Sequence, residues 1–122
     1  MPARVLCVTF DCRDPALVAA FWATALGYEE VPPEEAGWVM IADPTGSGPS
    51  LYFAPVPEPK VVKNRAHLDI GPETTMAAEV ERLVGAGASA VETLRHDTWT
   101  WTVMQDPEGN EFCVAEPVNG QP

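Results

Sequence analysis

Two stretches of the chain decide its fold: residues 101–109 read WTVMQDPEG, and residues 38–46 read WVMIADPTG. In both, a tryptophan opens an apolar, strand-like segment, and Asp-Pro-x-Gly follows at the same spacing. Asp at the first position, Pro at the second and Gly at the fourth are preferred in type I turns. A short apolar segment follows each turn, at residues 50–54 and 111–115. The sequence therefore predicts a repeated unit of strand, turn and strand.

The repeat extends toward the N-terminal side of each copy. Residues 4–11 and 65–70 alternate apolar and polar side chains, which is typical of half-buried strands. A helix is predicted after each strand, and the first has clear ends, with Asp14 as N-cap, Pro15 as first residue and Gly27 as stop. The second is expected to end at Gly85 and Gly87. The expected apolar stripes are Leu17, Val18, Phe21, Trp22, Ala25 and Leu26 in the first helix, and Met76, Val80, Leu83 and Val84 in the second.

The length of 122 residues suits one domain built from the two copies. Prolines at positions 55, 57 and 59 favour an extended, semi-rigid connection. We therefore expect module one at about residues 1–57, a linker at about 55–64 and module two at about 65–117. Residues 31–36, rich in Pro and Glu, are expected to form a loop.

The charge balance argues against several classes of partner. The chain has 7 basic and 18 acidic side chains and a formal net charge of −11, which repels phosphate backbones and anionic lipid. Lys60, Lys63 and Arg65 form a basic group too small for a nucleic-acid groove. Three cysteines without close paired spacing do not indicate structural disulfides. No secretory signature and no run of 18 apolar residues is found, so we expect a cytoplasmic protein that binds neither nucleic acid nor membrane.

Several motifs, in this order, resemble the vicinal-oxygen-chelate superfamily, which includes glyoxalase I, extradiol dioxygenases, and bleomycin- and fosfomycin-resistance proteins. They are Asp14-Pro15 after the first strand, the helix to Phe21-Trp22 and Leu26-Gly27-Tyr28, then His67-Leu68-Asp69, and QDPEGNEF at residues 105–112. The resemblance is greatest to the small glyoxalase-like branch. It implies an α+β fold of two tandem βαβββ modules, a curved mixed sheet around a cleft, a small-molecule ligand and usually a homodimer.

The resemblance also points to where a metal would bind. In metal-binding members the ligands, commonly His and Glu, come from the first and last strands of each module. The matching positions here are Cys7 or Thr9, Tyr52, His67 and Cys113, and only His67 keeps the usual residue type. Hard and borderline divalent ions prefer imidazole and carboxylate ligands. We therefore expect no metal cofactor; the alternative is a divalent ion such as zinc held by Cys7, His67 and Cys113.

Strand alternation predicts which side chains face the cavity. The apolar face, expected to pack under the helices, comprises Leu6, Val8, Phe10, Leu51, Phe53, Leu68, Ile70, Phe112 and Val114. The opposite face is rich in rings and poor in charge, which favours an aromatic or amphipathic ligand. Trp99 is expected on the face of Trp101 nearer the rim. The predicted cavity residues are Cys7, Thr9, Asp11, Trp38, Met40, Tyr52, His67, Asp69, Trp101, Val103 and Cys113.

Three functions remain open at this stage. The first is a metal-free protein that binds or sequesters an aromatic or amphipathic compound between Trp38, Tyr52 and Trp101. The second is an enzyme, either a metal-dependent lyase or dioxygenase, or a metal-free isomerase or cyclase in which His67 is the catalytic base. The third is a dimeric interaction module. His96 is expected in a solvated loop, and Glu111 at the surface beside the turn.

Overall fold

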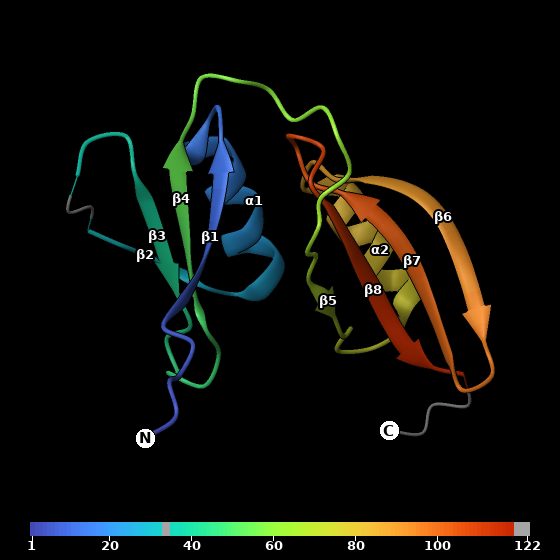
Figure 1. Cartoon of the computed structure of the whole chain (residues 1–122). Helices are drawn as coiled ribbons and strands as arrows, with labels where there is room; N and C mark the ends of the chain where they lie inside the picture. The colour runs from blue at the N-terminus through green and yellow to red at the C-terminus, as the bar shows by residue number, and fades with distance from the viewer. Residues whose placement is uncertain (33–34, 119–122) are drawn as a thin grey trace. The chain divides into compact units, whose positions relative to one another are not determined.

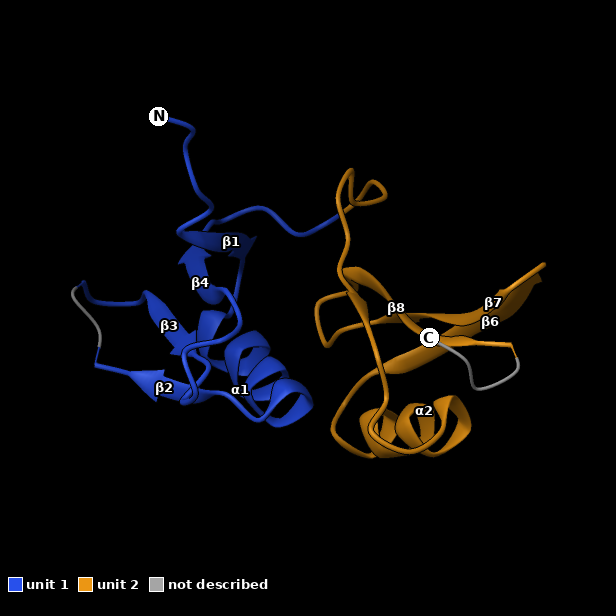
Figure 2. Cartoon of the chain, turned by 90° about the horizontal axis from the view of Figure 1, so that it is seen from below, with its two compact units in different colours: residues 1–60 blue, residues 61–122 orange. Residues whose placement is uncertain are grey.

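The computed structural model describes residues 1–32 and 35–118 of the chain. It contains two compact units, Met1–Lys60 and Val61–Pro122 (Figure 2). Each unit has one helix and one four-stranded mixed sheet, in the element order βαβββ (Figure 1). This is the predicted α+β fold of two tandem modules. The boundary between the units, after Lys60, falls inside the predicted linker.

The first unit consists of β1 (Cys7–Cys12), α1 (Pro15–Leu26), β2 (Glu29–Val31), β3 (Val39–Ala42) and β4 (Ser50–Pro55). Its strand order is β1-β4-β3-β2, with β1 parallel to β4 and the other neighbours antiparallel. The residue pattern did not indicate β2, and the predicted loop at residues 31–36 was wrong at Val31, which is the last residue of β2. Its residues pair with β3 although glutamate is rare in strands. Part of the predicted loop at residues 31–36, namely residues 33–34, lies outside the described residues.

Helix α1 has the predicted bounds and caps. The Asp14 carboxylate accepts a hydrogen bond from the Leu17 amide, and Gly27 adopts the left-handed conformation at φ 69°. The helix packs across one face of its sheet (Figure 1). Trp22, in the middle of the helix, is 0% exposed. For two residues the prediction of burial was wrong. Leu17 is 48% exposed because it lies on the solvent side of α1. Leu6 is 73% exposed because β1 begins one residue after it.

The second unit consists of β5 (Asp69–Ile70), α2 (Met76–Gly85), β6 (Ser89–His96), β7 (Trp99–Gln105) and β8 (Glu111–Pro117). Its strand order, β5-β8-β7-β6, repeats that of the first unit. The strand β5 is shorter than the predicted one at 65–70, although the Cys113 amide still donates to the Leu68 carbonyl at 2.9 Å just before it. The Asn64 amide donates to the Glu111 carboxylate at 2.9 Å. His96 is exposed but ends β6, so its placement in a loop was wrong.

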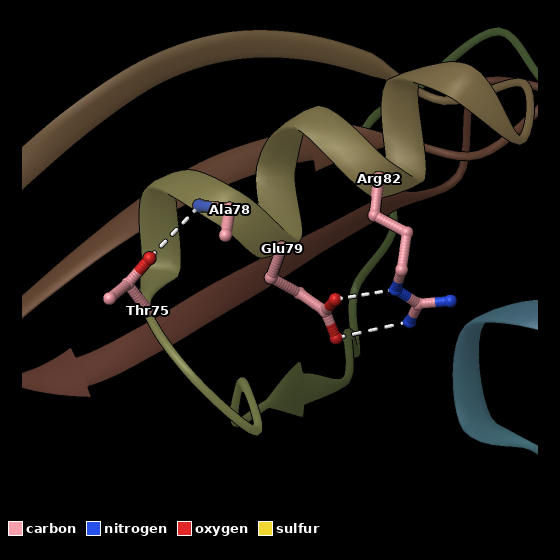
Figure 3. Close-up of polar contacts among 4 residues, drawn as sticks. All are labelled: Thr75, Ala78, Glu79 and Arg82. Atoms are coloured by element: carbon pink, nitrogen blue, oxygen red, sulfur yellow. Dashed lines mark hydrogen bonds and ion pairs between the residues drawn. The ribbon is translucent and has the colours of Figure 1, made fainter.

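Helix α2 has polar contacts at its start and along its exposed face. The Thr75 hydroxyl accepts from the Ala78 amide at 3.1 Å, and Arg82 binds the Glu79 carboxylate through two nitrogens at 2.6 and 3.1 Å (Figure 3). Of the residues expected in its stripe, Leu83 is buried, whereas Val84 is 47% exposed because it lies on the outer side of the helix. No helix in the described part of the chain is long and apolar enough to cross a membrane.

Both Asp-Pro-x-Gly segments form the predicted turns. The amide of the glycine donates to the carbonyl of the aspartate at 2.9 Å in the Gly46 turn and at 2.8 Å in the Gly109 turn. The Asp43 carboxylate accepts from the Thr45 hydroxyl and amide, and these bonds hold the pKa of Asp43 below its usual value. Asp106 is 4% exposed and accepts from the Asn110 amide at 3.0 Å. The second turn is therefore the more buried of the two.

Candidate functional site

The strand registers match the predicted site positions of the two units one to one. In each unit the residue two places after the tryptophan pairs with the last strand, and the last strand pairs in parallel with the first. Thr9 pairs with Tyr52, and Asp69 pairs with Cys113, so Thr9 and Asp69 hold matching positions. Two residues earlier in each strand, Cys7 therefore matches His67. The matched residues, first unit then second, are Trp38 and Trp101, Met40 and Val103, Tyr52 and Cys113, Thr9 and Asp69, and Cys7 and His67.

In the first unit the aromatic side chains pack against each other. The rings of Trp38 and Tyr52 have centroids 5.2 Å apart and meet edge to face at 68°. Cys7 Sγ lies 3.9 Å from Thr9 Oγ1, so both side chains occupy the same face of β1. Asp11 is exposed at the end of this row. Met40, beside Tyr52 in the register, is half-buried.

In the second unit the matched face opens into a pocket of about 530 Å³. Its lining includes four predicted residues and two that were not predicted as cavity residues, Trp99 and Ala115. Both have the right parity, because Trp99 lies two residues before Trp101 and Ala115 two after Cys113. The half-buried Val103 does not line this pocket. The lining residues are His67, Asp69, Trp99, Trp101, Cys113 and Ala115; we call this space the tryptophan pocket.

The side chain beside the tryptophan differs in size between the two units. In the first unit Tyr52 is in edge-to-face contact with Trp38. At the matched position of the second unit stands Cys113, which is 7% exposed and lines the tryptophan pocket together with the half-buried Trp101. The same strand pairing therefore places an aromatic ring beside the tryptophan in one unit and a short side chain beside it in the other.

Asp69 links the two other polar groups of the tryptophan pocket. Its Oδ1 lies 3.3 Å from His67 Nε2. Their separation by two residues along the chain did not by itself require so short a distance. Its carboxylate also accepts a hydrogen bond from the Cys113 thiol. Burial raises the pKa of that thiol, the charge and hydrogen bond of Asp69 raise it further, and Lys63 opposes them. Cys113 is therefore held as a neutral thiol.

A second pocket, of about 540 Å³, adjoins the first and shares Asp69, Trp99 and Ala115 with it. It lies where β5 ends: Gly71 and Pro72 follow Ile70 and leave the end of β8 beside the loop that leads to α2. Its remaining lining residues are Ile70, Gly71, Pro72, Thr74, Glu116 and Pro117. Sequence reasoning missed this second pocket, since alternation places Glu116 on the face opposite Cys113.

The residues at the family's metal-ligand positions do not fit a His/Glu-type ion. They supply one imidazole and no carboxylate, and one of them, Tyr52, is in ring contact with Trp38. A different set of donors is grouped in the second unit, where ligand atoms of His67, Asp69 and Cys113 all lie within 4.8 Å of one another. Of the alternative zinc set, His67 and Cys113 belong to this group, and Cys7 belongs to the first unit.

Solved structures of other proteins share the fold of this chain. A glyoxalase/bleomycin resistance protein/dioxygenase family enzyme from Burkholderia phytofirmans is 19% identical, with a TM-score of 0.68, covering 93% of this chain and 98% of that one. The fosfomycin resistance protein FosX from Listeria monocytogenes, solved with Mn(II) and 1S,2S-dihydroxypropylphosphonic acid, is 12% identical, with a TM-score of 0.76 and coverages of 93% and 90%. A glyoxalase family protein from Bacillus anthracis is 17% identical, with a TM-score of 0.69 and coverages of 96% and 97%.

These likenesses establish the fold. No curated protein matches the sequence significantly. The match that settles the family covers residues 7–115, from the first residue of β1 to the middle of β8, and is to the glyoxalase-like domain. Together with the two βαβββ modules, it shows that the chain belongs to the glyoxalase-like domain family, within the vicinal-oxygen-chelate superfamily.

Proposed function

We propose that the protein binds a small aromatic or amphipathic molecule in the tryptophan pocket, without a metal. The observation that carries this proposal is the pocket of the second unit that Trp99 and Trp101 line, beside the polar groups of His67 and Asp69. The pocket volume of about 530 Å³ lies within the range of about 300–1,000 Å³ usual for small-molecule sites.

The chemistry of the lining supports binding more directly than turnover. Trp99 and Trp101 offer flat apolar walls against which a ring can stack. Cys113 is a weak nucleophile, because its raised pKa keeps it protonated near neutral pH. His67 and Asp69 can fix the orientation of one polar group of the ligand. A sequestering protein needs these features and no further reactive group.

The proposal is tested by titrating the protein with a panel of aromatic compounds that includes 2-naphthylmethanol, with tryptophan fluorescence and calorimetry as readouts. We expect saturable binding and recovery of the compound unchanged after incubation. Replacing Trp101 by Ala removes a stacking wall and should weaken binding about 10- to 100-fold.

The matched control is Trp38→Ala in the first unit, for which we expect little change in affinity. If no compound binds, the proposal is wrong. If Trp38→Ala abolishes binding as strongly as Trp101→Ala, the ligand site includes both units, as the sequence-based prediction had it, and the tryptophan pocket alone is not the site.

The grouping of His67, Asp69 and Cys113 favours a second candidate, a metal-dependent enzyme that uses this set. A borderline ion such as zinc accepts imidazole, carboxylate and thiolate ligands, and its binding would release the Cys113 proton. Elemental analysis of the purified protein separates the two candidates. Stoichiometric metal that is lost in His67→Ala supports the enzyme, and a protein that takes up no added zinc removes it. A homodimer also remains a prediction, which native mass spectrometry tests.

A further inference from the structure

We infer that the molecule bound in the tryptophan pocket is a cation, an aromatic amine whose charged group lies between Asp69 and Glu116 in the adjoining pocket. This inference rests on the proposed function and adds the charge class of the ligand to it. It depends on the two pockets being joined, because Asp69, Trp99 and Ala115 line both. A ligand with its ring against the indoles therefore extends past Asp69 toward Glu116.

The formal charge of the residues that line the two pockets, counted with His67 neutral, is negative. Among the described residues that line the two pockets there are two carboxylates, Asp69 and Glu116, and no Lys or Arg. Outside this lining, Lys63 lowers the pKa of the Cys113 thiol, which Asp69 raises. The effect of Lys63 is the smallest of the four influences on that pKa. The formal net charge of the chain, −11, adds a field of the same sign.

Each carboxylate is held in place by the protein. Glu116 Oε1 accepts the Met76 amide at 2.7 Å at the start of α2, and Asp69 is flanked by His67 and Cys113. A carboxylate has two oxygens and can accept several hydrogen bonds, so these contacts leave acceptor capacity for an ammonium group. Orientation by neighbours lowers the entropy lost when a ligand binds.

The tryptophans favour the same charge. Trp99 lines both pockets and is 46% exposed, so its ring is accessible to a ligand. A cation over the face of an indole is attracted by the ring quadrupole, most strongly for tryptophan among the aromatic side chains. The aromatic walls, Asp69 at the junction of the two pockets and Glu116 in the adjoining one therefore select one class of compound, a ring that carries an amine.

The test uses three probes with one ring system: 2-naphthylmethylamine, which is a cation at neutral pH, the uncharged 2-naphthylmethanol and the anionic 2-naphthoate. Calorimetry of the full chain should give the tightest binding for the amine and the weakest for the carboxylate. Asp69→Asn or Glu116→Gln should weaken amine binding about five- to tenfold, and by more than it weakens binding of the alcohol. Raising the salt to about 1 M, where the Debye length is about 3 Å, should reduce the preference for the amine.

Glu81→Gln, which removes an exposed carboxylate of α2 outside both pockets, is the control and should change nothing. Thermal melts establish that each variant is folded, and because the Gln side chain of Glu116→Gln can still accept the Met76 amide, α2 should keep its start. Equal affinity for the three probes, or a preference for 2-naphthoate, overturns the charge inference while the binding proposal stands. Absence of binding by all three overturns both.

Discussion

Trp38 and Trp101 occupy the same place in two copies of one module, yet their neighbours differ. Tyr52 contacts Trp38 at a centroid distance of 5.2 Å, whereas Cys113, at the position matching Tyr52, lines the tryptophan pocket together with Trp101. The strand order is the same in both units. The difference shows that the same backbone position of this duplicated fold carries a large ring in one module and a short side chain in the other.

The helices show a second contrast. Six residues of α1 are buried, including Phe21 and Trp22, whereas Leu83 is the one buried residue of α2 among those described. Counted from the N-cap of each helix, the positions of Phe21 and Trp22 in the first helix hold Arg82 and Leu83 in the second. The first unit therefore has the larger packed core, and the second has the larger open surface on its sheet.

The two Asp-Pro-x-Gly turns should respond differently to loss of their aspartate. Asp106→Ala leaves the Glu108 and Asn110 amides and the Asn110 side chain without their acceptor, and Asn110 is buried. We expect a loss of about 1–3 kcal/mol in the free energy of unfolding, measured by urea denaturation. Asp43→Ala is the matched control, and its loss should be smaller, because water can replace the hydrogen bonds of the half-buried Asp43 more readily than those of the buried Asp106. Equal losses would contradict the contrast between the turns.

Filling the second unit as the first is filled should abolish binding. In Cys113→Tyr the phenol ring should contact Trp101 as Tyr52 contacts Trp38, and affinity for 2-naphthylmethanol should fall at least about tenfold, by more than about 1.4 kcal/mol. Cys113→Ser, which changes little volume, is the control and should retain binding. A Cys113→Tyr protein that melts cooperatively and binds as well as the unmodified chain would contradict the volume argument.

The thiol of Cys113 should react slowly until the pH is high. Because burial and then Asp69 raise its pKa above the usual value of 9.0, the neutral thiol dominates below that pH and the reactive thiolate appears only as the pH rises beyond it. Alkylation in a Cys7→Ser, Cys12→Ser background should therefore be slower than for a free thiol near neutral pH. Asp69→Asn lowers the pKa and should speed alkylation a few-fold. An unchanged or slower rate in that variant would show that Asp69 does not act on the thiol.

Much of the architecture could be predicted from the sequence. The caps Asp14, Pro15 and Gly27 fixed α1, because each satisfies a local backbone requirement that few residues meet. The two turns followed from the same kind of local signal. The strand β2 was missed because Glu29 and Glu30 have low strand propensity, and only pairing with β3 stabilises it.

The candidate site was less accessible to sequence reasoning. Alternation named the four predicted residues that line the tryptophan pocket and gave the parity of Trp99, which is a local property. It did not show that the ring of Tyr52 lies beside Trp38 in the first unit, or that the short side chain of Cys113 holds the matching position in the second. Both depend on which residues pair across strands. The adjoining pocket depends on where β5 ends and on Glu116, neither of which follows a periodic pattern.

The most direct test of the central claim is an amide chemical-shift map of the ¹⁵N-labelled chain titrated with 2-naphthylmethanol. The account predicts saturable shifts at Asp69, Trp101 and Cys113 and their neighbours, with the indole N–H of Trp101 among the largest, and little change at Trp38 and Tyr52. Shifts confined to Trp38 and Tyr52, or no shift at any of these residues, would contradict it.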